Sequence, residues 1–157
     1  MLTVTRYHDI SAGHRVVGHE NKCRHLHGHN YRVHFTLSAP QLDQLGRVMD
    51  FGFIKELLCE WLEQTWDHKM LMWKDDPMLE AMRDFLEGFE TDFRQGLCAV
   101  SFNPTAENMA RYLGETVGPA VLRGTGCTLV FVKIEETAKC SATWIHDTYP
   151  DGIGDPQ

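Results

Sequence analysis

Residues Asn30–Ser38 read NYRVHFTLS, and in this stretch apolar and polar side chains alternate with a period of two. Large apolar side chains occupy every second position from Tyr31 to Leu37, and polar or charged side chains fill the positions between them. Successive side chains of a β-strand point to opposite faces of a sheet. The pattern therefore predicts a strand with one buried face and one solvated face.

Three further segments predict strands on either side of this one. Residues Leu2–Ile10 (LTVTRYHDI) are rich in β-branched and aromatic types and alternate roughly with a period of two. Near the other end, Thr128–Glu135 (TLVFVKIE) and Ser141–Asp147 (SATWIHD) have the same character and are close enough in sequence to form a hairpin. We therefore expect two hairpins, one at each end of the chain.

Three segments predict helices, each beginning after a residue that can cap a first turn. Asp50 precedes the first, Asp76-Pro77 the second and Pro104-Thr105 the third, and apolar residues follow each at helical spacing. The second helix falls in an acidic stretch at about 72–102. We interpret that stretch as an insertion that lies on the surface.

The predicted order of elements is β-β-α-(α)-α-β-β, which is an α+β arrangement. It is satisfied by a four-stranded antiparallel sheet with helices on one face. Residues 1–147 are then a single domain carrying the insertion at about 72–102, and the Pro/Gly-rich residues 148–157 are a flexible tail. Such a sheet has two open edges, and association with further copies would cover them.

Length and composition exclude several classes of protein. The 157 residues, 43% hydrophobic and 24% charged, are typical of one globular domain. A net charge of −7 argues against a general binder of nucleic acid or membrane surfaces. No apolar run approaches the roughly 18 residues of a membrane span, and we expect no signal peptide in the opening MLTVTRYHD. Five scattered cysteines favour reduced thiols, so we expect a cytoplasmic protein.

Histidine is concentrated in one part of the chain. Seven of the nine fall between His8 and His34, which is the composition of a metal site. His27 and His29 lie two apart in a predicted strand, so their imidazoles can reach one ion, and His14 lies at the end of the preceding strand. Three imidazoles are a ligand set of catalytic zinc that leaves a fourth position open. From His14 to His34 the chain carries four cationic side chains against one Glu, which fits either an anionic small-molecule partner or a solvated surface loop.

Cys23 stands four residues before His27 and has three interpretations. It is a fourth, structural zinc ligand, a small buried hydrophobic residue, or a separate thiol base or nucleophile near the metal. Spacing alone does not decide between the zinc ligand and the separate thiol.

Four other positions could take part in a site. In the dipeptide Asp67-His68 the carboxylate can orient the imidazole for proton transfer, although such a dipeptide taken alone is usually incidental. Thr105 and Glu107 open the third predicted helix, where they also suit a cap and a dipole-complementing acid. Glu136 ends a predicted strand, where its carboxylate could accept paired N–H donors from a heterocycle or face solvent.

These separate features follow one order along the chain. They are A-G-H at Ala12–His14, C-R-H-L-H-G-H-N-Y at Cys23–Tyr31, G-R-V-M-D-F at Gly46–Phe51, W-D-H at Trp66–His68, P-T-A-E-N at Pro104–Asn108 and V-K-I-E-E-T at Val132–Thr137. In this order the sequence resembles the family of 6-pyruvoyl-tetrahydropterin and 6-carboxy-tetrahydropterin synthases, and within it the bacterial queuosine branch.

The resemblance implies roles for the candidate residues. Zn²⁺ would be held by the three histidines, and Cys23 would move protons on the substrate side chain. Asp67 and His68 would act as the relay of that thiol, and Glu136 would anchor the pterin ring. Thr105 and Glu107 match positions at or near the substrate pocket. The full metal-ligand set is His14, His27 and His29.

The resemblance also implies a fold, an assembly and a reaction. The fold is the tunnelling fold, in a homohexamer of two stacked trimers with active sites between subunits. The reaction is the zinc-dependent lyase conversion of 7,8-dihydroneopterin triphosphate to 6-carboxy-tetrahydropterin, acetaldehyde and triphosphate. Alternatives are a 6-pyruvoyl-tetrahydropterin synthase, an enzyme accepting other dihydropterins, and a non-catalytic zinc- or pterin-binding module. The stretch at 72–102 is longer than in compact members.

Overall fold

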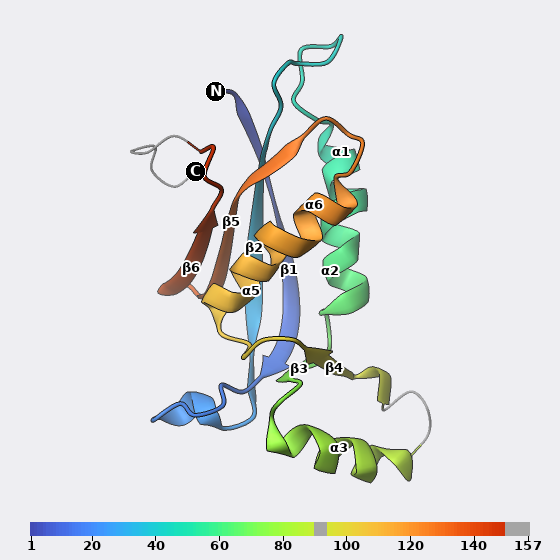
Figure 1. The fold of residues 1–157 in the computed structure, drawn as a ribbon, viewed down its shortest axis with the longest axis vertical. Helices are drawn as coiled ribbons and strands as arrows, with labels where there is room; N and C mark the ends of the chain where they lie inside the picture. The colour runs from blue at the N-terminus through green and yellow to red at the C-terminus, as the bar shows by residue number, and fades with distance from the viewer. Residues whose placement is uncertain (90–93, 150–157) are drawn as a thin grey trace.

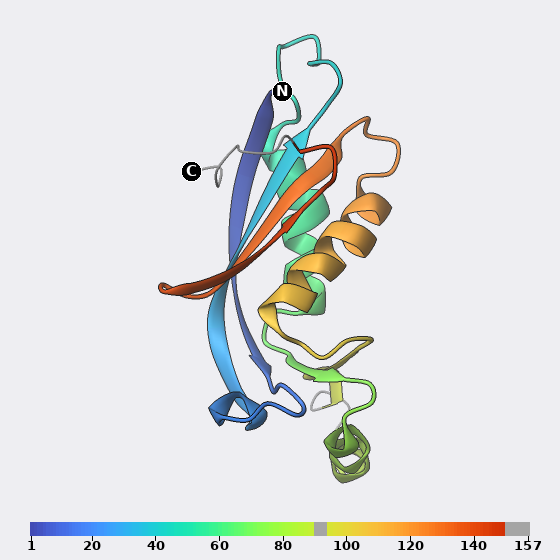
Figure 2. The ribbon, with the colours of Figure 1, turned by 60° about the vertical axis from the view of Figure 1, so that its left-hand side comes forward.

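The computed structural model describes residues 1–89 and 94–149, in which one curled sheet carries helices on one of its faces (Figure 1, Figure 2). The strands are β1 (Thr3–His14), β2 (His27–Ser38), β3 (Met70–Trp73), β4 (Leu97–Val100), β5 (Thr128–Thr137) and β6 (Cys140–Ile145). The helical elements are η1 (Lys22–Arg24), α1 (Phe51–Ile54), η2 (Lys55–Cys59), α2 (Glu60–Thr65), α3 (Pro77–Glu87), α5 (Ala106–Tyr112), η3 (Leu113–Val117) and α6 (Gly118–Val121).

The sheet has six strands in the order β4-β3-β1-β2-β5-β6. The four long strands pair antiparallel as predicted, but β3 pairs parallel with β1 and β4 parallel with β3. The prediction of a four-stranded antiparallel sheet was therefore wrong. The two additional strands are four residues long, too short to show a strand period.

The first two strands are both longer than predicted. Each has 12 residues, and their register runs from Thr3 opposite Ser38 to His14 opposite His27. The alternating pattern predicted the first strand only as far as Ile10, with His14 near its end, because the small residues Ala12 and Gly13 have little β-propensity of their own. This extension brings the histidines at the end of β1 and the start of β2 side by side.

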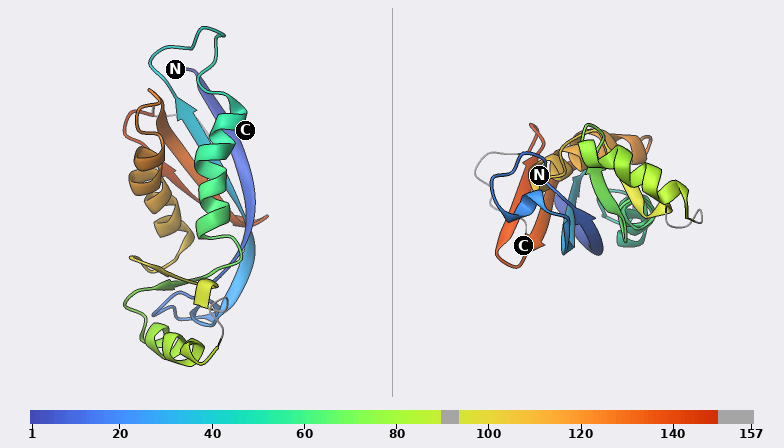
Figure 3. Two further views of the ribbon diagram at one scale, coloured as in Figure 1. Left: turned by 90° about the vertical axis from the view of Figure 1, so that its right-hand side faces the viewer. Right: turned by 90° about the horizontal axis from the view of Figure 1, so that it is seen from below.

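The core lies between the sheet and the helices. Alternate side chains of β2, from Tyr31 to Leu37, are fully buried there, which confirms the predicted buried face. The helical elements α1, η2 and α2 form one continuous rod, and α5, η3 and α6 form a second. Both rods lie against the same face of the sheet (Figure 3). No helix in the described part of the chain has the length and apolar character needed to cross a membrane.

The three predicted caps are confirmed. The side chain of Asp50 accepts a hydrogen bond from the N–H of Gly52, and Asp76 does the same for Met78. The Thr105 hydroxyl accepts from the N–H of Asn108.

The segment predicted as an insertion, 72–102, runs from β3 through α3 to β4. Helix α3 lies at the end of the molecule where β1 ends and β2 begins (Figure 1). Residues 90–93 of this segment, and 150–157 of the predicted flexible tail, lie outside the described residues. A single domain over residues 1–147 remains a prediction.

The second helical rod approaches β6 closely at Gly114. A Cβ atom added there would overlap the indole ring of Trp144, whose N–H donates to Glu115. We expect Gly114→Ala to lower the free energy of unfolding by about 1–3 kcal/mol, because the ring must move from its packed position.

Chemical denaturation tests this expectation, with Gly88→Ala as the matched control. A Cβ at Gly88 meets its nearest atom, the Phe85 carbonyl oxygen, at an ordinary 3.7 Å. That substitution should change stability by less than about 0.5 kcal/mol. Equal denaturation midpoints for the two variants would contradict the close packing of the rod on β6.

Candidate metal centre and substrate pocket

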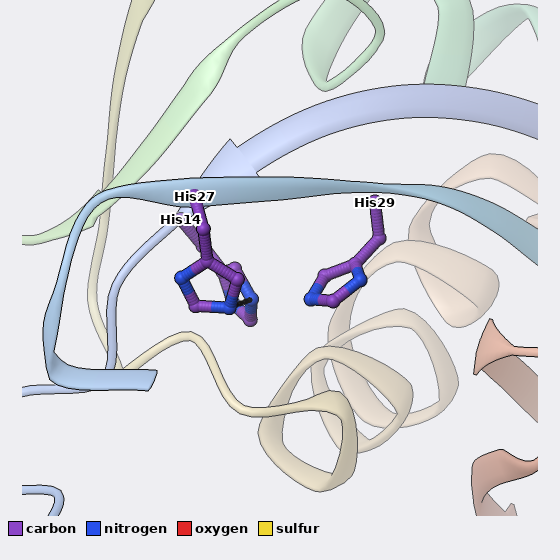
Figure 4. Close-up of side chains that lie close together, drawn as sticks. All are labelled: His14, His27 and His29. Carbon is purple, nitrogen blue, oxygen red and sulfur yellow. Dashed lines mark hydrogen bonds between the residues drawn. The ribbon is translucent and has the colours of Figure 1, made fainter. Parts of the chain in front are cut away.

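Three imidazoles meet at the end of the first hairpin. His14 is the last residue of β1, and His27 and His29 are the first and third of β2. Because His14 lies opposite His27 in the register, and His29 lies two residues further along β2, all three side chains project from the same face. Figure 4 shows the rings converging, and one nitrogen from each lies within 4.8 Å of the others. The group predicted from sequence is therefore assembled.

The hydrogen bonds of two of the rings fix where their lone pairs point. Nδ1 of His14 donates to the Pro104 carbonyl at 2.7 Å, and Nδ1 of His27 donates to the His25 carbonyl at 2.8 Å. Since a carbonyl only accepts, both Nδ1 atoms carry the hydrogen, and in the neutral rings both Nε2 atoms carry lone pairs. These two Nε2 atoms are 3.1 Å apart. Two lone pairs at that distance repel unless a cation lies between them.

The third ring offers an unused nitrogen. Nε2 of His29 is buried and has no hydrogen-bond partner among the described residues. A buried polar atom without a partner costs free energy, and a metal ion would supply that partner. The three Nε2 atoms therefore fit a divalent metal that prefers nitrogen ligands.

Burial also keeps two of these rings uncharged. It lowers the pKa of His14, although the hydrogen bond to Pro104 opposes the shift, and it lowers the pKa of His29, opposed by the Glu136 carboxylate. Neutral imidazole is the form that binds metals. At neutral pH the cluster is accordingly better suited to a metal ion than to a proton.

A pocket of about 270 Å³ opens beside the cluster and contains most of the other predicted residues. Its wall includes His14, Cys23, Thr105, Glu107 and Glu136.

Glu136 projects toward the cluster from β5. Its Oε1 atom lies 3.4 Å from Nε2 of His14 and 3.6 Å from Nε2 of His29. The side chain is 25% exposed, so it lines the pocket while remaining accessible to a ligand.

Cys23 reaches the same pocket from η1, the short turn between β1 and β2, and is only partly buried. Among the described residues, the group of mutually close metal-binding atoms consists of the three imidazoles and does not include the Cys23 sulfur. This arrangement fits a separate thiol better than a fourth metal ligand.

The structure does not bring Asp67 and His68 to Cys23. Nδ1 of His68 donates to Asp67 at 2.7 Å, and the other oxygen of Asp67 accepts from the N–H of Ser11 at 2.9 Å. Although burial opposes it, these hydrogen bonds lower the pKa of Asp67 and keep it ionised. The pair lines a different pocket, of about 550 Å³, with outward-facing residues of β1 and β2 such as Asn30. Within one chain the predicted relay is therefore not assembled.

Sequence reasoning missed Tyr31 as a residue of the site. Its fully buried ring packs edge-on against His14 and His29, at centroid distances of 5.9 and 5.4 Å. The hydroxyl has no hydrogen-bond partner among the described residues, and burial together with Glu136 raises its pKa well above the usual value. The strand period places Tyr31 on the same face as the two histidines before it, which is the signal that could have identified it.

Comparison with known proteins finds a matching family and similar sequences, and both cover most of the chain. Residues 3–146 match the family described as 6-pyruvoyl tetrahydropterin synthase. A 6-carboxy-5,6,7,8-tetrahydropterin synthase of Rickettsia typhi is 36% identical over 140 residues, which are 89% of this chain and 97% of that protein.

Two solved structures have a similar fold. An uncharacterised protein of Wolinella succinogenes superposes with a TM-score of 0.79 at 24% identity, over 93% of this chain and 98% of that one. The 6-pyruvoyl tetrahydropterin synthase of Caenorhabditis elegans gives a TM-score of 0.63 at 24% identity, over 93% and 96% of the two chains. The chain therefore belongs to the 6-pyruvoyl tetrahydropterin synthase family.

Proposed function

We propose that the protein is a cytoplasmic, zinc-dependent 6-carboxy-5,6,7,8-tetrahydropterin synthase. It would convert 7,8-dihydroneopterin triphosphate and water to 6-carboxy-tetrahydropterin, acetaldehyde and triphosphate, a lyase reaction of the queuosine pathway. The observation that carries this proposal is the cluster of three imidazoles that opens onto a pocket with a thiol and a carboxylate. The relatives named 6-carboxy-5,6,7,8-tetrahydropterin synthase, at 34–36% identity, support the choice of product.

The metal would be held by Nε2 of His14, His27 and His29. Zn²⁺ bound there supplies a Lewis acid that lowers the pKa of substrate hydroxyls. The chain's own contribution is to fix the tautomers of two rings through the carbonyls of Pro104 and His25, so that their lone pairs already face the ion.

Cys23 is the proposed base. Cys23 lines the pocket beside the proposed metal ligands but its sulfur lies outside the ligand group, so as a thiolate it could take a proton from a substrate carbon. Lys22 and Arg24 belong to the same short turn and are exposed. Their charges suit a triphosphate that extends out of the pocket.

Glu136 is the proposed anchor of the pterin ring. A carboxylate can accept two parallel N–H bonds from a heterocyclic amide-amine edge, which fixes the orientation of the ring as well as its position. Thr105 and Glu107 lie on the same pocket wall, at the start of α5. They would contact the substrate inside this pocket.

The relay requires a second copy of the chain. Asp67 and His68 line a pocket apart from Cys23, and the His68 side chain is 81% exposed. Two long edges of the sheet are available for association, because the outer side of β6 and that of β1 before Ser11 have no strand partner in the described residues. We therefore propose a homohexamer of two trimers, in which each active site combines the Cys23 of one chain with the Asp67-His68 pair of another.

The reaction itself is tested by incubating zinc-loaded protein with 7,8-dihydroneopterin triphosphate. We expect 6-carboxy-tetrahydropterin by mass spectrometry and acetaldehyde in a trapping assay. Cys23→Ser should lower kcat by roughly 10²–10⁴-fold, the usual contribution of a general base, with zinc content unchanged. Cys127→Ser is the matched control, because Cys127 lies outside the site and its thiol donates to the Val48 carbonyl as a hydroxyl could.

Two outcomes would contradict the proposed reaction. Formation of 6-pyruvoyl-tetrahydropterin without acetaldehyde would show that the protein is instead a 6-pyruvoyl-tetrahydropterin synthase. Pterin binding without turnover, unchanged by Cys23→Ser, would assign a non-catalytic binding protein.

The shared active site is tested by mixing two inactive variants, Cys23→Ser and His68→Ala. Each alone should be nearly inactive. After dissociation and reassembly together, about a quarter of the sites should combine two intact halves and regain activity. The negative control is a mixture of Cys23→Ser with the variant that carries both Cys23→Ser and His68→Ala, because no chain in it has an intact Cys23. Mixed oligomers that stay inactive would contradict the assignment of Cys23 and His68 to different chains.

A further inference from the structure

The segment that carries Cys23, residues 15–26, connects β1 to β2 and lies at the same end of the molecule as α3 (Figure 1). Most of its side chains are exposed or only partly buried, so it has little core of its own. Several internal hydrogen bonds fold it, and the one that links its start to Cys23 runs from the N–H of Val16 to the carbonyl of Cys23 at 2.8 Å. The position of the Cys23 backbone therefore depends on where Val16 is held.

The residue before Val16 is held by the insertion. Nε of Arg15 donates to Oδ2 of Asp76 at 2.7 Å, and the Asp76 side chain is fully buried. The second oxygen of Asp76 accepts from the N–H of Met78 at 2.8 Å and caps α3. One buried carboxylate thus joins the first turn of α3 to the residue that follows the metal ligand His14.

The residue after Val16 is held by Asn103. The Asn103 side chain accepts from the N–H of Val17 and donates to its carbonyl, both at 2.9 Å. The carbonyl of Asn103 in turn accepts from the N–H of Thr105 at 2.8 Å and from the side chain of Asn108 at 3.0 Å. Asn103 is therefore fixed to the start of α5 while it binds the Cys23 segment.

The contact of Arg15 with Asp76 and that of Val17 with Asn103 lie on either side of Val16, whose N–H bonds to the Cys23 carbonyl. A buried ion pair is strongly weakened when one partner loses its charge, since the other is left uncompensated. An amide that satisfies both the N–H and the C=O of one residue fixes that residue in two directions. The pair at Arg15 and the amide at Val17 thus determine the course of the chain from His14 toward Cys23.

We propose that Asp76 and Asn103 are positioning residues for Cys23. Through Arg15 and Val17 they hold the segment that carries the thiol against the histidine cluster. The insertion at 72–102 accordingly supports the reactive thiol rather than being a surface addition. The kinetic part of this inference rests on the proposed function, whereas the placement of the thiol does not.

The test compares Asp76→Asn and Asn103→Ala with the parent protein and with Glu80→Gln. Asp76→Asn keeps an oxygen to cap α3 but removes the charge that pairs with Arg15. Glu80→Gln is the matched control, since Glu80 pairs with Arg83 on the exposed side of the same helix at 3.3 Å. The readouts are the peptide-resolved alkylation rate of Cys23 by iodoacetamide in the folded protein, the bound zinc per chain, kcat and KM, and the melting temperature.

In both variants we expect Cys23 to be alkylated severalfold faster, because the segment is released, while the alkylation of Cys98 stays unchanged. Turnover should fall by about 10²-fold in kcat, the size of effect that a small displacement of a reacting group produces, with a smaller change in KM. Zinc content should remain that of the parent protein.

A lower melting temperature with parental Cys23 alkylation and parental kcat in both variants would overturn the proposal, because the contacts would then serve only stability. If Asp76→Asn does not fold, Asn103→Ala alone decides by the same readouts. If the parent protein shows no turnover, the proposed function fails, but the alkylation rates still decide whether Asp76 and Asn103 position the thiol.

Discussion

The site is built around two imidazole lone pairs that face each other. His14 and His27 each donate Nδ1–H to a backbone carbonyl, which leaves their Nε2 atoms directed at one another across 3.1 Å. Burial lowers the pKa of His14, so protonation is a poor way to relieve the repulsion. A metal ion relieves it and also gives the buried Nε2 of His29 its missing partner. The arrangement is costly without a cation and favourable with one.

This arrangement depends on parts of the fold that are distant in sequence. The register of β1 with β2 sets His14 opposite His27, and the carbonyl of Pro104, just before α5, sets the tautomer of His14. Asn103, its neighbour, holds the segment that carries Cys23. The start of α5 therefore organises the histidine cluster, the thiol segment and one wall of the pocket together. A shift of the second helical rod relative to the sheet would disturb all three.

The parts of the fold that were predicted are those determined by local sequence. Alternation in β2 and the caps at Asp50, Asp76 and Thr105 act within a few residues, so the long strands and the helices could be anticipated. The strands β3 and β4 could not, because they are short apolar runs whose parallel pairing depends on contacts far away in sequence. The histidine cluster was predictable from its spacing. The separation of Cys23 from His68 was not predictable. It depends on how α2, which precedes His68, and β1, which contacts it, place this side chain beside the outward-facing residues of the sheet.

The proposed metal centre has three imidazole ligands and no thiolate ligand, at the end of the first hairpin. X-ray absorption at the zinc edge of the zinc-loaded, substrate-free protein tests this ligand set. We expect nitrogen and oxygen neighbours only, with three imidazoles at about 2.0–2.1 Å. A sulfur neighbour at about 2.3 Å would place Cys23 on the metal and show that the proposed ligand set is wrong.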